Sequence, residues 1–241
     1  MIKTLKKAVR VLDSAVDSLL LFVFLLLFLI GVYGLYDSYL VYLDANDTSI
    51  LKYKPGYDSG NGETKEILDD MVAWLTIDDT NVDYPVMQGE TNNDYLNKDP
   101  FGDYALSGSI FLDSRNSKDF SDDYSLVYGH HMEHGMMFGA LDKYLDEEYF
   151  ETHKKGTLIV DDVEYDITIF AVVEADATNE MIFAPTEVEV SETLEFVIDH
   201  ALYLNKEDAA NMKNKKLLGM STCKFPDTVE RTILIAYLEK R

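Results

Sequence analysis

Three side chains that can take part in covalent chemistry stand at the ends of apolar segments. Cys223, the only cysteine, ends the segment KLLGMSTC, and His130 ends SLVYGH. Arg231 opens RTILIAYLEK, so pairing of the two last segments as strands would bring its guanidinium near the thiol. An imidazole or cation beside a cysteine lowers the thiol pKa to about 3.5–7.5, and a guanidinium can stabilise an acyl oxyanion. These residue types predict acyl transfer through a thioester.

Cys223 and Arg231 also have structural interpretations. A buried cysteine packs like a small apolar side chain, and an arginine at a strand end is often a solvated charge. A metal site is a further alternative, because His130 and His134 would share one face of a helix and Glu133 lies between them. The order H-H-M-E-H lacks the H-E-x-x-H spacing of zinc proteases, however. A single cysteine also excludes an intramolecular disulfide and a cysteine-rich zinc site.

Short apolar segments separated by turn residues dominate the chain after residue 73 and predict strands. The predicted strands are 74–77, 82–87, 107–113, 125–130, 216–223 and 231–240, with a hairpin over 157–176 that turns near Asp161 and Asp162. Apolar residues at helical spacing predict helices over 63–73, 137–145 and 191–205, the last with Ser191 as a candidate N-cap. Many short strands with a few helices favour a β-barrel or sandwich over a doubly wound sheet.

An uncharged apolar segment near the N-terminus, residues 19–36, is long enough to cross a membrane. Its 18 residues would span roughly 27 Å as a helix, close to the thickness of bilayer hydrocarbon. Four cations precede it and aspartates follow it, which places the N-terminus in the cytoplasm and the remaining chain outside. A cleaved signal peptide is the alternative, but its apolar stretch is usually about 7–15 residues and ends in an A-x-A-like site. The sequence therefore favours an uncleaved anchor.

The composition restricts the partners of the chain. Its 241 residues include 21 Lys and Arg against 44 Asp and Glu, a formal charge of −23. Nucleic-acid binding needs a basic surface, so we expect no nucleic-acid partner. The expected organisation is a cytoplasmic segment at 1–18, a transmembrane anchor at 19–36, a linker at 37–62 and one catalytic domain at 63–241.

Five motifs, which occur along the chain in the order typical of the family, resemble those of the sortases, and among them class B. Ser221-Thr222-Cys223 resembles the end of the family's cysteine motif, and Arg231 matches its strand-end arginine. The segment Y-G-H-H-M at 128–132, followed by Met137-Phe138 and Leu141, resembles the class B segment around the histidine. G-S-I-F-L-D-S-R-N at 108–116 and the strands over 74–89 resemble further family segments. The likeness covers roughly residues 63–241.

The resemblance implies an eight-stranded sortase β-barrel with an N-terminal helical extension. It implies a cysteine transpeptidase on the outer face of a Gram-positive cell membrane, with no cofactor and no metal. By this resemblance, Cys223 attacks a threonine carbonyl in the C-terminal sorting signal of a secreted protein. His130, with His131 as its rival, protonates the leaving amine and deprotonates the incoming amine. Arg231 positions the substrate backbone and stabilises the oxyanion.

The resemblance also indicates residues of the substrate groove. Leu96, Ile182 and Ser221 fall where the class B pattern places groove residues, and ordinary packing is the alternative for each. Met220 stands where leucine is usual, and Lys224 stands where class B members often carry an acid. Both departures flank the groove, so they bear on substrate preference rather than on catalysis.

The sequence does not identify the acceptor amine. The leading hypothesis is that the enzyme joins surface proteins to a peptidoglycan precursor amine. The second is that it joins pilin subunits through a lysine side chain. Two hypotheses of other classes are an anchored binding module in which Cys223 is structural, and a metal-dependent wall hydrolase that uses His130 and His134. Substitution of Cys223 and sensitivity to a chelator distinguish these classes.

Overall fold

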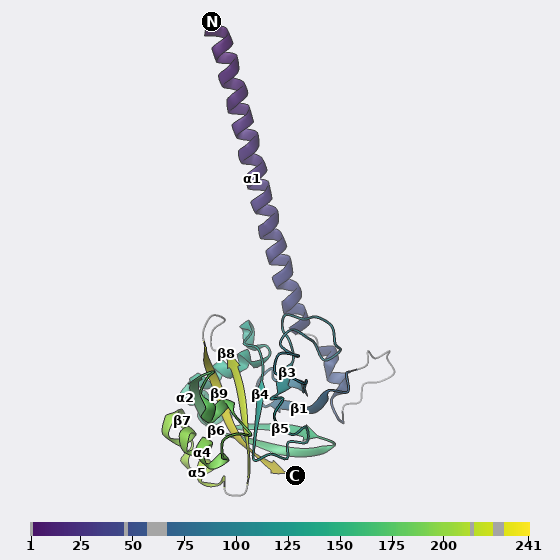
Figure 1. Ribbon diagram of the computed structural model, residues 1–241, viewed down its shortest axis with the longest axis vertical. Helices are drawn as coiled ribbons and strands as arrows, with labels where there is room; N and C mark the ends of the chain where they lie inside the picture. Colours follow the sequence, from purple (N-terminus) through teal and green to yellow (C-terminus); the bar gives the residue numbers. More distant parts are fainter. Residues whose placement is uncertain (1, 46–47, 57–66, 213–214, 224–228) are drawn as a thin grey trace. The chain divides into compact units, whose positions relative to one another are not determined.

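The computed structural model describes residues 2–45, 48–56, 67–212, 215–223 and 229–241 (Figure 1). The chain divides into two compact units, Met1–Asp44 and Ala45–Arg241. The first unit is formed by one helix, α1 (Ile2–Ala45), in which Val9–Leu43 is long and apolar enough to cross a membrane. Residues 37–45, expected as the start of a linker, continue this helix because no glycine or proline interrupts them.

The second unit is built around a closed β-barrel. Eight strands follow one another in the order β5-β1-β2-β3-β4-β8-β9-β6, pairing of β5 with β6 closes the ring, and β7 adds a ninth strand beside β6. The predicted eight-stranded barrel with peripheral helices is confirmed. The strands are β1 (Met71–Ile77), β2 (Asp83–Met87), β3 (Ile110–Leu112), β4 (Tyr124–Tyr128), β5 (Lys155–Val160), β6 (Val163–Asp176), β7 (Ala201–Leu204), β8 (Lys216–Cys223) and β9 (Glu230–Lys240).

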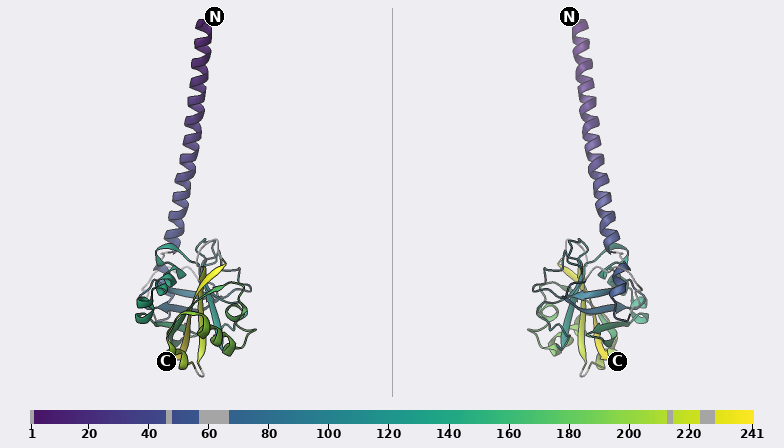
Figure 2. Two further views of the ribbon diagram at one scale, coloured as in Figure 1. Left: turned by 90° about the vertical axis from the view of Figure 1, so that its left-hand side faces the viewer. Right: turned by 90° about the vertical axis from the view of Figure 1, so that its right-hand side faces the viewer.

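Short helices lie around the outside of this barrel, as both side views in Figure 2 show. They are the 3₁₀ helices η1 (Thr48–Tyr53), η2 (Glu133–Gly135) and η3 (Phe138–Leu145) and the α-helices α2 (Glu147–Thr152), α3 (Glu180–Phe183), α4 (Val190–His200) and α5 (Lys206–Ala210). The helical prediction for 137–145 is confirmed as η3.

Two apolar cores explain why β9 is apolar along almost its whole length. Leu234 and Ala236 alternate into the barrel interior, whereas Ile233 and Ile235 face a second core. That second core includes Val197 of α4, along with Ala209 of α5. Because helices cover its outer face, β9 is buried on both sides, which replaces the alternation of a half-exposed strand with a continuous apolar run.

The helix predicted over 63–73 is wrong for the residues that the structure describes. Residues 63–66 lie outside the described part of the chain, 67–70 form an irregular turn, and β1 begins at Met71. From Ala73 onward every second residue enters the barrel core: Ala73, Leu75 and Ile77. The alternation of core-facing residues begins at Ala73, inside the segment predicted as a helix. The segment forms a strand because this alternation gives β1 a face that packs into the core.

The helix predicted over 191–205 is shorter than expected. It ends at His200, and residues 201–204 form β7 instead. This segment becomes a strand because the free edge of β6 offers unpaired backbone groups, to which β7 bonds. The N-cap of α4 is Glu189 rather than Ser191, and it makes no side-chain capping hydrogen bond.

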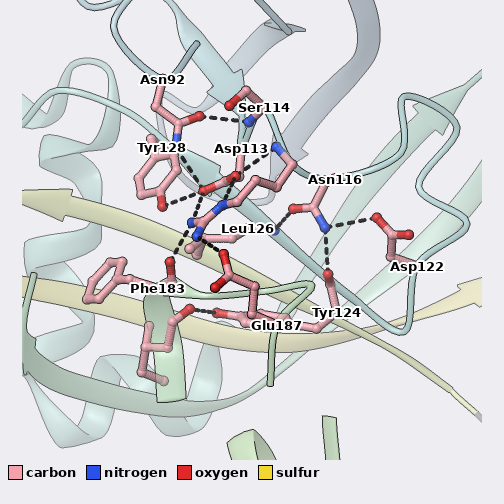
Figure 3. A network of polar contacts seen from close by, with 12 residues as sticks. Asn92, Asp113, Ser114, Asn116, Asp122, Tyr124, Leu126, Tyr128, Phe183 and Glu187 are labelled. Atoms are coloured by element: carbon pink, nitrogen blue, oxygen red, sulfur yellow. Dashed lines mark hydrogen bonds and ion pairs between the residues drawn. The ribbon is translucent and has the colours of Figure 1, made fainter. Parts of the chain in front are cut away.

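A buried carboxylate ties together the segments at one edge of the barrel (Figure 3). Asp113, directly after β3, is completely buried. It accepts hydrogen bonds from the side chains of Asn92 (2.9 Å), Tyr128 (2.9 Å) and Arg115 (2.8 Å). The segment after β2, the end of β4 and the loop after β3 therefore meet at one charge, which needs these partners because a buried carboxylate is unfavourable without them.

Arg115 extends this connection to the segment between β6 and α4. Its guanidinium donates to the carbonyl oxygen of Phe183 and forms an ion pair with Glu187 at 3.0 Å. Burial acts to raise the pKa of Asp113, but hydrogen bonds from Arg115, Tyr128 and Asn92 hold that pKa below its ordinary value. Asp113 is therefore an anion in the folded protein, and Arg115 is the cation beside it.

Replacing Arg115 with methionine should destabilise the folded protein by about 3 kcal/mol, because the buried Asp113 carboxylate loses its cation. Urea unfolding of the full chain in detergent measures this loss. Arg241→Met is the matched control, since Arg241 pairs with Glu164 and Asp166 on the exposed surface, where an ion pair contributes less than about 1 kcal/mol. Equal losses in the two variants would contradict the special importance of the buried pair.

Candidate active site

Two parallel strands bring the predicted nucleophile and base to one edge of the barrel. β4 and β8 are parallel neighbours, with Tyr128 opposite Ser221, and the N–H of Gly129 donates to the carbonyl oxygen of Ser221 (3.1 Å). His130 and Cys223 each lie two residues beyond this pair. Their backbones therefore occupy corresponding positions at the same end of adjacent strands.

Arg231 lies directly across the strand ladder from Cys223. β8 and β9 are antiparallel, and their register pairs these two residues, which confirms the strand pairing on which the sequence argument depended. Hydrogen bonds from Thr178, together with the positive charge of Arg231, hold the pKa of Asp176 below its ordinary value. Residues 224–228 between the two strands, including Lys224, lie outside the described residues.

A groove of about 340 Å³ opens at this edge of the barrel. Four residues singled out from the sequence line it together: His130, Arg231, Leu96 and Ser221. The other described residues in its walls are Asn92, Phe111, Arg115, Tyr128, Gly129, Ala177, Phe183 and Thr222. Several of these belong to the Asp113 network of Figure 3, so one buried carboxylate fixes groove-lining residues from different segments.

The two candidate histidines have different surroundings. His130 is half-buried, and its Nε2 lies 2.6 Å from the carbonyl oxygen of Leu96. His131 places its Nε2 2.6 Å from a carboxylate oxygen of Asp142 in η3. His131 is not among the described residues that line the groove. The geometry therefore favours His130 over its neighbour as the base.

The three candidate groove residues do not share one environment. Leu96 is half-buried in the groove wall, and Ser221 is buried, with a hydroxyl that has no hydrogen-bond partner among the described residues. Ile182 is completely buried in the second core rather than in the groove, so ordinary packing describes its place. The next residue, Phe183, enters the groove wall and stacks on Tyr128, with ring centroids 6.5 Å apart.

The sequence predicts no aromatic lining for the groove, yet Phe111, Tyr128 and Phe183 contribute to it. Phe111 and Tyr128 stand inside two of the family-like motifs, so their motif positions are the signal that could have assigned them. Asn92 stands in a polar turn without periodicity, and only its bond to the buried carboxylate reveals its place.

The metal-dependent alternative has no geometric basis in the described part of the chain. There, no group of three or more His, Cys, Asp or Glu side chains is placed to hold a metal ion. His134 lies in the short turn η2 with a left-handed backbone (φ 60°), and His130 precedes this turn. The two histidines therefore do not share the helix face that their spacing would give them.

Known proteins similar in sequence point to one family. Residues 75–239 match the family model described as Sortase domain. Sortase B of Listeria monocytogenes is 36% identical over 176 residues, which cover 68% of this chain and 69% of that protein. Sortase B of Staphylococcus aureus is 28% identical over 181 residues, which cover 73% of each.

Solved structures point to the same family. A Streptococcus pyogenes class B sortase involved in pilus biogenesis superimposes with a TM-score of 0.65 at 36% identity, over 72% of this chain and 94% of that chain. Staphylococcus aureus sortase B superimposes with a TM-score of 0.65 at 27% identity, over 73% and 84%. The matched family model, the barrel and these relatives agree, and the chain belongs to the sortase family of cysteine transpeptidases, in its class B.

Proposed function

We propose that this chain is a membrane-anchored sortase that cleaves a sorting signal near the C-terminus of secreted proteins and transfers the preceding part to an amine. Cys223 is the nucleophile, His130 is the acid and base, and Arg231 positions the substrate backbone. The strand register carries this proposal. Cys223 pairs with Arg231, and Cys223 and His130 stand at corresponding positions beyond the Tyr128–Ser221 pair.

The proposed reaction consists of two acyl transfers. His130 takes the thiol proton of Cys223, and the sulfur forms a thioester with the carbonyl carbon of the signal's threonine while the following C–N bond breaks. His130 then gives that proton to the leaving amine. An acceptor amine then attacks the thioester, His130 takes its proton, and the thiolate leaves. Arg231 donates hydrogen bonds to the oxyanion in both transfers. One amide replaces another, so the sum of the two transfers balances without ATP or an electron carrier.

The walls of the groove support the binding of an extended peptide. They combine aromatic rings with a few polar groups, as ligand sites commonly do. We assign Leu96 to an apolar contact with the sorting signal and Ser221 to a polar one, because the buried Ser221 hydroxyl still needs a partner. Ile182 supports the Phe183 wall from the core.

Two acceptor amines remain compatible with the site. The first, which we favour, is an amine of a peptidoglycan precursor, and its use would fix surface proteins to the cell wall. The second is a pilin lysine. One observation favours the second: the Streptococcus pyogenes structure, at 36% identity, belongs to a class B sortase involved in pilus biogenesis.

The helix α1 supports a single-pass anchor with the catalytic unit outside the cell. Its apolar part, Val9–Leu43, is long enough to cross a bilayer. The cations before residue 19 are Lys3, Lys6, Lys7 and Arg10, and such a cluster is retained on the cytoplasmic side. The groove would then face the compartment in which secreted proteins and wall precursors meet.

A mixture of sorting-signal peptides should form a covalent adduct with the full chain in detergent. The intact mass should rise by the N-terminal fragment of one peptide, because the thioester holds that fragment until an amine arrives. Cys223→Ala should form no adduct, and His130→Gln should react about 10²–10⁴-fold more slowly.

His131→Gln is the matched control for this experiment and should react at nearly the wild-type rate. His131 pairs with Asp142 and is not among the described groove residues. If His131→Gln lost as much activity as His130→Gln, the assignment of the base would be wrong. An adduct on Cys223→Ala would reject the thioester mechanism.

The acceptor is identified by competition for the preformed thioester. A peptide with a free α-amino group, as in a wall cross-bridge, and a pilin-like peptide with one internal lysine are added at equal concentration. We expect the α-amino product to dominate in the mass spectrum, because the favoured acceptor is a cross-bridge amine rather than a lysine within a protein. A dominant lysine product would contradict wall anchoring and support pilus assembly.

The membrane orientation is tested with single cysteines in a Cys223→Ala background. Ser14→Cys lies before the uncharged segment 19–36, and Glu195→Cys lies on the exposed surface of α4. An impermeant maleimide applied to intact Gram-positive protoplasts should label residue 195 and should label residue 14 only after lysis. Labelling of residue 14 in intact protoplasts would overturn the proposed orientation.

A further inference from the structure

The contact between His130 and the backbone of Leu96 determines where the histidine carries its proton. Nε2 of His130 lies 2.6 Å from the carbonyl oxygen of Leu96. A carbonyl oxygen has lone pairs and no hydrogen, so the ring nitrogen must be the donor. Neutral His130 therefore holds its hydrogen on Nε2, and its Nδ1 carries the free lone pair.

Another histidine of the chain has the opposite arrangement. Nδ1 of His200 lies 2.9 Å from the carbonyl oxygen of Phe196. By the same reasoning this ring holds its hydrogen on Nδ1. The Nε2–H form of His130 is thus set by its place beside Leu96, and the chain contains its own reference for the other tautomer.

The Leu96 carbonyl packs closely against a glycine. Gly108 has a left-handed backbone (φ +59°), and a Cβ atom there would overlap the carbonyl oxygen of Leu96 and lie 2.7 Å from that of Tyr95. The N–H of Ser109 donates to the carbonyl oxygen of Tyr95 (3.0 Å), and the Tyr95 hydroxyl donates to Asp70 (2.7 Å). The loop around Leu96 therefore packs directly against a backbone position that only glycine fits.

We propose that the Leu96 carbonyl orients His130 so that Nδ1 is the atom that exchanges protons with the amines, and that Gly108 is a positioning residue for that carbonyl. This inference rests on the proposed role of His130. In each cycle Nδ1 takes the thiol proton of Cys223 and gives it to the leaving amine, then takes a proton from the acceptor amine and returns it to the Cys223 thiolate, while the hydrogen on Nε2 stays bonded to Leu96. The backbone carbonyl thus has the orienting role that a side-chain amide or carboxylate has in other nucleophile–histidine pairs.

The tautomer is measured directly by nuclear magnetic resonance. The full chain is labelled with ¹⁵N-histidine in detergent, and nitrogen–proton correlations are recorded at about pH 9, where imidazoles are neutral. The signals lost in His130→Gln and His200→Gln assign the two rings. We expect Nε2–H for His130 and Nδ1–H for His200. An Nδ1–H form of His130 would overturn the inference, whatever the activity.

The role of Gly108 is tested by Gly108→Ala, which pushes on the Leu96 carbonyl. We expect kcat to fall about 10–100-fold, because a displaced base is out of reach of the amine, and the Nε2–H form of His130 to lose its dominance. Gly102→Ala is the matched control. It also places an alanine at a glycine with positive φ (+90°), but its new Cβ meets only the Leu68 side chain, at 3.3 Å.

Gly102→Ala should keep both the tautomer and kcat, even if its urea midpoint falls. Equal effects of the two alanines on kcat and on the tautomer would overturn the positioning role of Gly108. If Gly108→Ala does not fold, the wild-type tautomer still decides the inference. An Nε2–H form together with a fully active His130→Gln would instead reject the proposed acid–base role and leave the hydrogen bond as a structural one.

Discussion

The parallel pairing of β4 with β8 is the constraint on which the site depends. These strands are distant in the sequence, and their register alone places the positions of His130 and Cys223 at one barrel edge. The antiparallel partner of β8 then adds Arg231 through its own register. Backbone hydrogen bonds thus bring together three residues that lie apart in the sequence. A shift of one residue in either strand pairing would separate them again.

Burial keeps these strands in register. Leu218 and Met220 of β8 enter the barrel core, while Leu217 enters the second core, so β8 cannot slide without exposing apolar side chains. The loops that complete the groove lack such burial. Asp113 provides their connection through buried hydrogen bonds, which place the residues from several segments on a rigid support.

The sequence predicts the barrel, because apolar segments with turn residues between them fix the strands. It also predicts which residue types meet at one edge, since Cys223, His130 and Arg231 stand at strand ends. It could not predict β7, since residues 201–204 become a strand only through the free edge of β6. It misassigned 67–73 because helical spacing and alternation overlap there. The Asp113 network was also beyond reach: Asn92 and Arg115 lie in loops without periodicity, and their meeting depends on tertiary structure.

The distance in sequence between β4 and β8 also bears on how the active site comes into being. Hairpins such as β1–β2 and β5–β6 join near neighbours and can form early, whereas the β4–β8 pair must close a long loop. During synthesis, a chain whose β8 has not yet emerged has the proposed base without the proposed nucleophile. Under the proposed mechanism, Cys223 meets His130 only once this long-range pairing is complete. The reactive combination of thiol and imidazole would therefore exist only in the closed barrel and not in a partly folded chain.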